Sequence, residues 1–168
     1  MTLARRILIL GGIALAIIGM CHGTWYAVFA EHQTLDRMGG SLVSAFTQAA
    51  NRDSAQAQAA LADYRQLKYV HDRQADAHGH WIGLAMLLIV LGIVFDRVAL
   101  REKWKSPLAI ALLTGAVTFP LSVFLQTLSH GPLPRALSIA SSALMIAALT
   151  IAAFRFASAQ SNPTPIDR

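Results

Sequence analysis

The sequence is poor in cysteine and in charged residues. Cys21 is the single cysteine among 168 residues, which excludes an intramolecular disulfide and a Cys-x-x-Cys motif for zinc or haem attachment. Charged residues make up 14% and hydrophobic residues 55% of the chain, with a mean hydropathy of +0.48, whereas a soluble domain carries about 25% charged residues. This composition argues against a disordered chain, a soluble enzyme and a nucleic-acid partner.

Familiar catalytic motifs are absent as well. The sequence contains no Gly-x-Ser-x-Gly elbow, no phosphate-binding loop and no His-Glu-x-x-His motif, so no hydrolase or transferase is indicated. The enzymatic role left open is that of an oxidoreductase component.

Four apolar segments are present instead, at residues of about 7–30, 79–96, 107–128 and 136–154. A bilayer-spanning helix needs about 20 apolar residues, and no alternating strand pattern competes with this assignment. The sequence therefore predicts an all-α, integral membrane four-helix bundle that forms one domain over residues 1–168, with the lipid bilayer as its first partner. A cleaved secretory signal ending at Ala30 is the rival interpretation of the first segment, but that segment exceeds the usual apolar length of 7–15 residues.

Basic residues predict the orientation of the bundle. They lie before the first span, between the second and third spans, and after the fourth span, as Arg5, Arg6, Arg97, Arg101, Lys103, Lys105 and Arg155. In a four-span topology these regions share one side, which the positive-inside rule assigns to the cytoplasm. We therefore expect a bacterial inner-membrane protein with both termini in the cytoplasm.

Residues 31–78 then form a periplasmic helical cap. Leu35, Met38, Leu42 and Phe46 recur at helical spacing, and a second stripe begins at Ala57. Residues 51–54 have the composition of a turn and helix start. A helical hairpin whose second arm leads into the second span is the expected architecture.

All six histidines fall on the expected outer side. The stripe of Ala57, Leu61, Tyr64 and Leu67 continues through His71, Ala75 and His78, which are predicted to point inward, whereas His80 falls on nearly the opposite side. Asp76 lies four residues before His80 and could orient it, and Asp72 is a further supporting carboxylate.

Polar residues also occur inside the spans. His22 lies beside Trp25 and Tyr26 in the first span, where ionisable residues are rare and by default functional. The stripe of Gly12, Ala16, Gly19 and Gly23 suits close helix contact. The residues that suit interhelical hydrogen bonds are Thr118, Ser122, Gln126, Ser138, Ser141 and Ser142. Gln126 shares its helical face with His130 and could support it.

These residues suggest a metal or haem site. Imidazole ligands suit haem iron, copper and zinc. The metal candidates are His22, His71, His78, His80 and His130. A pocket for haem b, the first choice, would use His22, His78, His80 and His130 with Trp25, Tyr26 and Trp81. Copper is the second choice and zinc the third.

The run Ala77-His78-Gly79-His80, followed by Leu84, Leu87, Leu91 and Gly92, resembles the start of a membrane helix in small multi-span relatives of the haem–copper oxidase catalytic subunit and in similar nitric-oxide-response membrane proteins. The resemblance covers about fifteen residues of the second span. It implies that His78 and His80 bind haem or metal at the outer end of that helix. The chain is too short for that subunit and has no second histidine pair in a later span, so oxygen reduction is not implied.

Three functions remain open. The first is electron transfer or redox and gas sensing, with a quinol or a periplasmic redox partner. The second is a non-catalytic subunit or assembly factor that docks a partner membrane subunit, or a further copy of itself, through the small-residue stripe and the cap. The third is a metal-handling transporter, which the absence of charged residues inside the spans disfavours.

Overall fold

The computed structural model describes residues 1–129 and 131–161, which form helices and short connections without any strand. The elements are α1 (Leu3–Trp25), the π-helical turn η1 (Tyr26–Ala30), α2 (Glu31–Ala50), α3 (Ser54–Val94), the 3-10 turn η2 (Phe95–Arg97), α4 (Glu102–Leu128) and α5 (Pro132–Ser161). The predicted all-α class is confirmed.

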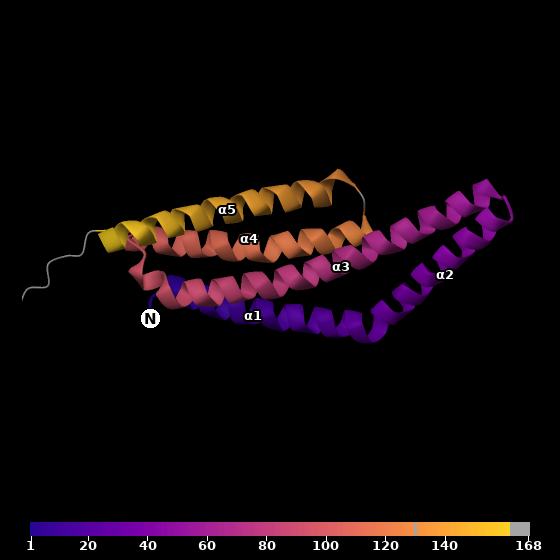
Figure 1. Ribbon diagram of the computed structural model, residues 1–168. Helices are drawn as coiled ribbons and strands as arrows, with labels where there is room; N and C mark the ends of the chain where they lie inside the picture. Colours follow the sequence, from indigo (N-terminus) through magenta and orange to yellow (C-terminus); the bar gives the residue numbers. More distant parts are fainter. Residues whose placement is uncertain (130, 162–168) are drawn as a thin grey trace, which may run out of the picture.

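The helices form a four-helix bundle with a projecting arm (Figure 1). The bundle consists of α1, the second half of α3, α4 and α5, which lie side by side along their lengths. The arm, residues 31–78, consists of α2 and the first half of α3, and its outer part extends beyond the ends of α4 and α5. It occupies the residues of the predicted cap and has the predicted hairpin shape.

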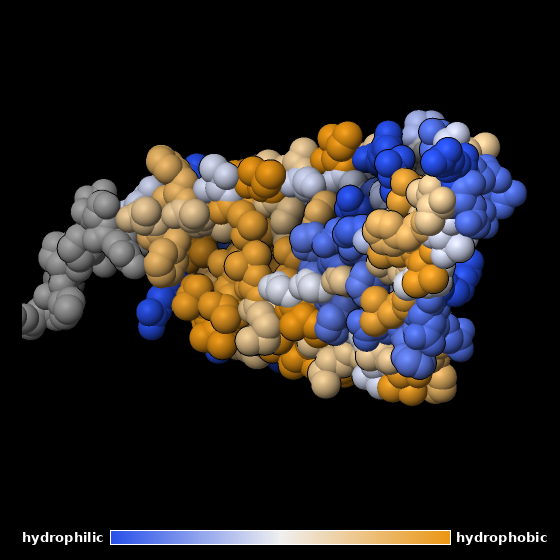
Figure 2. All heavy atoms as spheres, turned by 45° about the vertical axis from the view of Figure 1, so that its right-hand side comes forward, coloured by the Kyte–Doolittle hydropathy of each residue, from blue (hydrophilic) through white to orange (hydrophobic). Residues whose placement is uncertain are grey.

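Four helices are long and apolar enough to cross a membrane, within Leu3–Ala50, Ser54–Arg97, Glu102–Leu128 and Pro132–Ser158. Each contains one of the predicted spans. Large apolar side chains such as Leu10, Ile139 and Ile146 are more than 60% exposed on the bundle. Figure 2 shows a broad hydrophobic surface on the bundle and a mostly hydrophilic arm. Monomeric soluble proteins rarely expose so large an apolar surface, and the pattern fits a multi-pass membrane protein.

The two helices of the arm are joined by a short turn. Arg52 has a φ of 60°, in the left-handed region that non-glycine residues seldom occupy. Asp53 then caps α3, because its side chain accepts a hydrogen bond from the Gln56 amide at 3.1 Å. The predicted turn and helix start are confirmed, and α3 continues unbroken from this cap into the bundle.

Glycines bring α1 and α3 into close contact, which we call the α1–α3 seam. A Cβ atom added to Gly12 would lie 2.9 Å from the backbone oxygen of Ala85, and one added to Gly19 would lie 2.7 Å from Cβ of Trp81. In the bilayer, helices associate through such close packing rather than through the hydrophobic effect. The predicted small-residue contact face is therefore used inside the protein.

The seam follows a seven-residue repeat on both helices. On α1 the inward positions are Leu8, Gly12, Leu15, Gly19, His22 and Tyr26; on α3 and η2 they are Ala57, Ala60, Tyr64, Leu67, His71, Gln74, His78, Trp81, Ala85, Leu88, Gly92 and Phe95. A strict seven-residue repeat winds helices around each other with a left-handed twist, because an α-helix has 3.6 residues per turn. The stripe predicted at 3.6-residue spacing included Ala75, which is wrong: Ala75 is exposed and Gln74 is buried.

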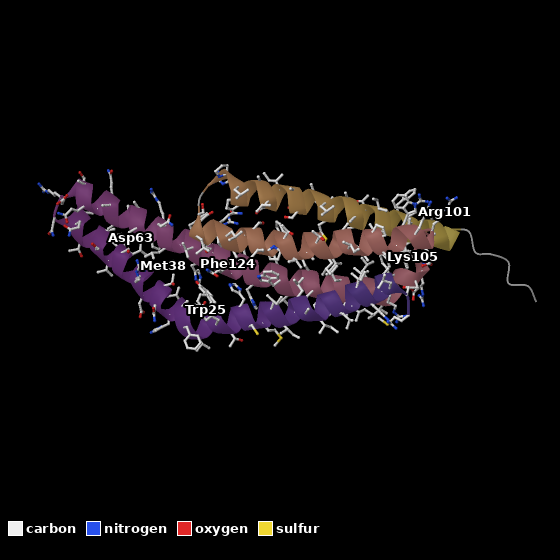
Figure 3. All side chains as sticks on the ribbon, turned by 180° about the vertical axis from the view of Figure 1, so that it is seen from behind. Trp25, Met38, Asp63, Arg101, Lys105 and Phe124 are labelled. Carbon is white, nitrogen blue, oxygen red and sulfur yellow. The ribbon has the colours of Figure 1, made fainter. Side chains whose placement is uncertain are left out.

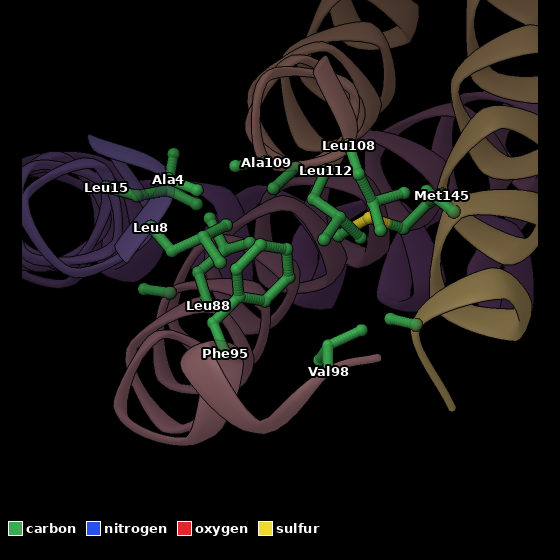
Figure 4. Close-up of a cluster of buried hydrophobic side chains, with 14 of the residues drawn as sticks. Ala4, Leu8, Leu15, Leu88, Phe95, Val98, Leu108, Ala109, Leu112 and Met145 are labelled. Carbon is green, nitrogen blue, oxygen red and sulfur yellow. The ribbon is translucent and has the colours of Figure 1, made fainter. Parts of the chain in front are cut away.

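A cluster of buried apolar side chains fills the half of the bundle far from the arm (Figure 4). Leu8 of α1, Leu88 of α3, Phe95 of η2 and Leu112 of α4 are fully buried there, and Met145 of α5 closes the cluster. This packing holds all four bundle helices together.

The basic segments gather at that same end. The Arg5 guanidinium lies 3.3 Å from the Asp96 carboxylate, and the Lys105 ammonium donates to the Asp96 backbone carbonyl at 3.3 Å. The Ala99 backbone amide donates to the backbone carbonyl of Arg155 at 3.3 Å. Figure 3 shows Arg101 and Lys105 at the opposite end of the bundle from Trp25 and Phe124. The predicted grouping of the basic segments on one side of the bundle is confirmed.

The seam can be tested with glycine-to-alanine substitutions. We expect Gly12→Ala to lower the free energy of unfolding by about 1–3 kcal/mol, the typical cost of overpacking, since its Cβ would meet the backbone of α3. Gly83→Ala is the matched control, because nothing lies within 4 Å of its Cβ position; it should gain up to about 1 kcal/mol of helix propensity. Unfolding in mixed detergent micelles measures both, and equal stabilities would contradict the seam.

Candidate functional site: a histidine-containing polar layer

The heptad positions become polar where the seam meets the arm. His22 Nε2 lies 2.8 Å from Oε1 of Gln74, a side chain that is 7% exposed. Because an amide oxygen only accepts, His22 donates from Nε2. Its Nδ1 is then an acceptor, and this atom is buried without a hydrogen-bond partner.

His71 and His78 also bond to α1 or to the turn that follows it. The Tyr26 hydroxyl lies 2.7 Å from Nδ1 of His71, and Tyr26 begins the π-helical turn. His78 donates from Nδ1 to the Gly19 carbonyl at 3.0 Å. A Cβ at Gly23 would lie 2.3 Å from the His78 ring, so glycine is required for this approach. The inward orientation predicted for His71 and His78 is confirmed.

Aromatic rings surround His22. Its ring centre lies 5.6 Å from Phe124 of α4 in an edge-on contact, 6.3 Å from Trp25 and 6.5 Å from His78. Trp25 is half exposed. Trp81 is buried against Gly19, which lies about one helical turn before His22 on α1. Trp81 is therefore not one of the rings around His22.

The other histidines lie apart from this group. His80 is exposed on another face of α3, as predicted, with its ring centre 4.7 Å from that of Phe119. His32 is exposed on α2 and lies 3.4 Å from Asp36. His130 lies outside the described residues.

The two candidate supporting carboxylates bind basic neighbours on α3. Asp72 accepts from Lys68 at 2.6 Å and Asp76 accepts from Arg73 at 3.2 Å. The pKa of the Lys68 ammonium group is raised above its ordinary value. The largest cause is the hydrogen bond that Lys68 donates to Asp72, and the second is the negative charge of Asp72. Asp72 and Asp76 are therefore paired along α3 itself.

A second set of hydrogen bonds joins α3, α4 and α5 at the same level. Gln126 donates to Oγ of Ser138 at 2.8 Å and lies 3.5 Å from the Tyr69 hydroxyl, while the hydroxyls of Ser122 and Ser138 are 2.7 Å apart. The predicted interhelical role is confirmed for Ser122, Gln126 and Ser138. It is wrong for Ser141 and Ser142, whose hydroxyls donate to carbonyls of α5 itself. Together these side chains form what we call the polar layer: His22, Tyr26, Tyr69, His71, Gln74, His78, Ser122, Gln126 and Ser138.

Gln74 and Tyr69 are the members of the polar layer that the sequence reasoning missed. Gln74 lies seven residues after Leu67 and seven before Trp81, and both of those residues are buried. The seven-residue repeat is therefore the signal that would have found Gln74. Tyr69 lies outside that repeat, and no sequence signal indicated it.

The polar layer does not bring a full metal-ligand set together. Within residues 1–129 and 131–161, no three histidine, cysteine, aspartate or glutamate side chains are grouped closely enough to hold a metal. The ring centres of two histidines, His22 and His78, are 6.5 Å apart. The ring of His78 also lines a groove of about 580 Å³ between α1 and α3, with Met20, Thr24, Ile82 and Met86 among its walls.

Comparisons of the chain with protein-family models, with curated proteins and with solved structures found no match.

The bond between His22 and Gln74 can be tested by Gln74→Leu. We expect this variant to lose about 1 kcal/mol of stability, a typical value for an interhelical hydrogen bond in a bilayer, because His22 Nε2 loses its partner. It should also change the His22 tautomer seen by ¹⁵N NMR. Gln58→Leu is the control, since Gln58 is exposed on the same helix. An unchanged His22 signal in Gln74→Leu would refute the bond.

Proposed function

We propose that this protein is a non-catalytic subunit or assembly factor of a larger membrane complex, with the bundle as its anchor and the arm as its binding module. The carrying observation is an exposed apolar surface on the arm. Leu35, Val43 and Phe46 of α2 are 47%, 66% and 74% exposed, although the arm lies outside the hydrophobic part of the surface (Figure 2).

These residues form one strip along α2. Leu35, Gly39, Val43 and Phe46 follow helical spacing, and the strip faces away from Ala45, which is buried against α3. Nothing lies within 4 Å of a Cβ position at Gly39. A small residue flanked by large apolar ones lets a second helix approach closely, so the occupant we propose is a helix of a partner subunit.

The contacts of the polar layer support a non-catalytic role. His22, His71 and His78 each bond to a neighbouring group of this chain. Polar residues at inward heptad positions hold the register of packed helices. The polar layer then fixes where the arm leaves the bundle, which a docking module requires.

The distribution of charge supports an orientation. In our proposal the basic end of the bundle lies in the cytoplasm, as the positive-inside rule requires, with both termini on that side. The arm then stands in the periplasm of a bacterial inner membrane.

The docking role predicts that one partner co-purifies at fixed stoichiometry with the full chain. Phe46→Glu should reduce its yield at least tenfold, because the interface would have to bury an unpaired charge. Ser44→Glu is the matched control, since Ser44 is exposed on the other side of α2. A photo-crosslinking residue at position 43 should capture the partner.

The outcomes separate the alternatives. A wild-type chain that purifies alone, or equal losses in the two glutamate variants, would overturn the proposal. A crosslinked product with twice the mass of this chain would show that the strip binds a second copy. A single replacement of His22 or His78 should leave the partner bound, because the other hydrogen bonds of the polar layer still hold the arm against α1.

Copper binding is a second candidate, favoured by the pair of His22 and His78. Two imidazoles on opposite sides of one ion have ring centres at most roughly 6.3 Å apart, because each metal–nitrogen bond is about 2 Å long. The ring centres of His22 and His78 are 6.5 Å apart, so a small approach of the two rings would let them share an ion. His22 Nδ1 has no partner, and Nε2 of His78 remains available once Nδ1 bonds to Gly19.

Haem and zinc fit these residues less well. A haem between His22 and His78 would need helices that stand apart, whereas α1 and α3 are in contact at Gly19 and Gly23. A structural zinc site usually has four ligands, and the described residues bring no three together. The resemblance to oxidase relatives stays a prediction. A site shared by His78 and His80 is not favoured, because the two side chains lie on different faces of α3.

Copper analysis after dialysis of the purified protein tests the second candidate. We expect one equivalent in the wild type and at least tenfold weaker retention in His22→Ala and His78→Ala, while circular dichroism confirms that both variants are folded. His32→Ala should retain the metal, since His32 lies on the outside of α2. Copper-free wild type would exclude the site.

A further inference from the structure

The basic end of the bundle contains a second hollow, distant from the polar layer. It has a volume of about 550 Å³ and lies between the start of α4, with Trp104 and Leu108, and the end of α5, with Ile151, Phe154 and Arg155. Ligand pockets typically enclose about 300–1,000 Å³. Its walls are apolar apart from Arg155 and Thr150, and Phe154 is 68% exposed, so the hollow opens sideways on the surface that faces lipid.

Positive charge is in excess around this hollow. The carboxylates near it are already paired: Asp96 binds Thr2 and Arg5, and Glu102 binds Lys105. Within residues 1–129 and 131–161, Arg155 lies within ion-pair distance of no carboxylate. An anionic group is the complement of this arginine.

Trp104 indicates the depth of the hollow in the bilayer. Its ring is half exposed, and the Lys103 ammonium lies 5.9 Å from the ring centre. Tryptophan and lysine in this arrangement are typical of the level of the lipid headgroups. The apolar walls of the hollow therefore lie deeper in the bilayer than the headgroups, and the guanidinium of Arg155 lies at the headgroup level.

We propose that this hollow binds one anionic glycerophospholipid, with an acyl chain against Leu108, Ile151 and Phe154 and the phosphate on Arg155. Basic pockets between membrane helices on the cytoplasmic side recognise anionic headgroups in this way. A free phosphate would satisfy Arg155 but would leave the apolar walls uncovered. The site rests on the membrane location given under the proposed function, but it does not depend on the docking role of the arm.

Native mass spectrometry of the full chain in detergent tests this site, with phosphatidylglycerol and phosphatidylethanolamine as probes. We expect one bound phosphatidylglycerol, retained at least fivefold better than phosphatidylethanolamine and not displaced by inorganic phosphate. Arg155→Gln should remove this preference, and Thr150→Trp, which fills the hollow, should reduce retention of both lipids.

Arg97→Gln is the matched control for charge. Arg97 is exposed at the same end, without a carboxylate partner among the described residues, and does not line the hollow. It should leave binding within twofold of the wild type. Equal losses in Arg97→Gln and Arg155→Gln, or equal retention of the two lipids, would overturn the proposal.

A separate measurement distinguishes failure of this site from failure of the membrane location. If cell fractionation finds the chain in the membrane while phosphatidylglycerol is not preferred, the lipid site alone is wrong. If the chain is found in the soluble fraction, the membrane location fails and the lipid site fails with it.

Discussion

The close contact of α1 with α3 is the constraint on which the rest of the structure depends. Glycines at positions 12, 19 and 23 place α3 directly against the α1 backbone, and the seven-residue repeat keeps the two helices in register over the length of the bundle. Because α3 continues without a break into the arm, the same contact also fixes the direction in which the arm projects (Figure 1). Without this seam, neither the polar layer nor the arm would have a defined position.

The polar layer is the point where the seam changes its chemistry. Towards the basic end, the heptad positions hold Leu8, Leu15 and Leu88, and the contact depends on shape alone. Towards the arm they hold His22, Tyr26, His71 and Gln74, and the contact depends on hydrogen bonds. A polar group in the bilayer is costly unless it is bonded. These bonds therefore favour one alignment of α1 along α3 over shifted alignments. The Nδ1 atom of His22 has no hydrogen-bond partner and is the atom that the proposed copper site would use.

Much of this architecture could be predicted from particular residues. The apolar runs indicated the four spans, the arginines and lysines indicated which ends lie together, and the spacing of Gly12, Gly19 and Gly23 indicated a contact face. The assignment of Ala75 to the inward face was wrong because the stripe was extended at 3.6 residues per turn, whereas supercoiled helices repeat every 3.5. After several turns that difference moves the buried position to Gln74. Asp76 was expected to orient His80, but Arg73, one turn earlier on the same helix, is its partner.

The sequence by itself determined the number of helices that are long and apolar enough to cross a membrane, the gathering of basic residues at one end of the bundle and the presence of histidines towards the other, since hydropathy and charge patterns depend only on the residues and their order. The tertiary structure alone decided which side chains meet. It placed His22 on Gln74 and near His78, separated His80 from them, and formed the hollow beside Arg155 from the start of α4 and the end of α5, two segments about fifty residues apart in the chain. These pairings depend on the rotation of each helix about its own axis, and only the packing of one helix against another fixes that rotation.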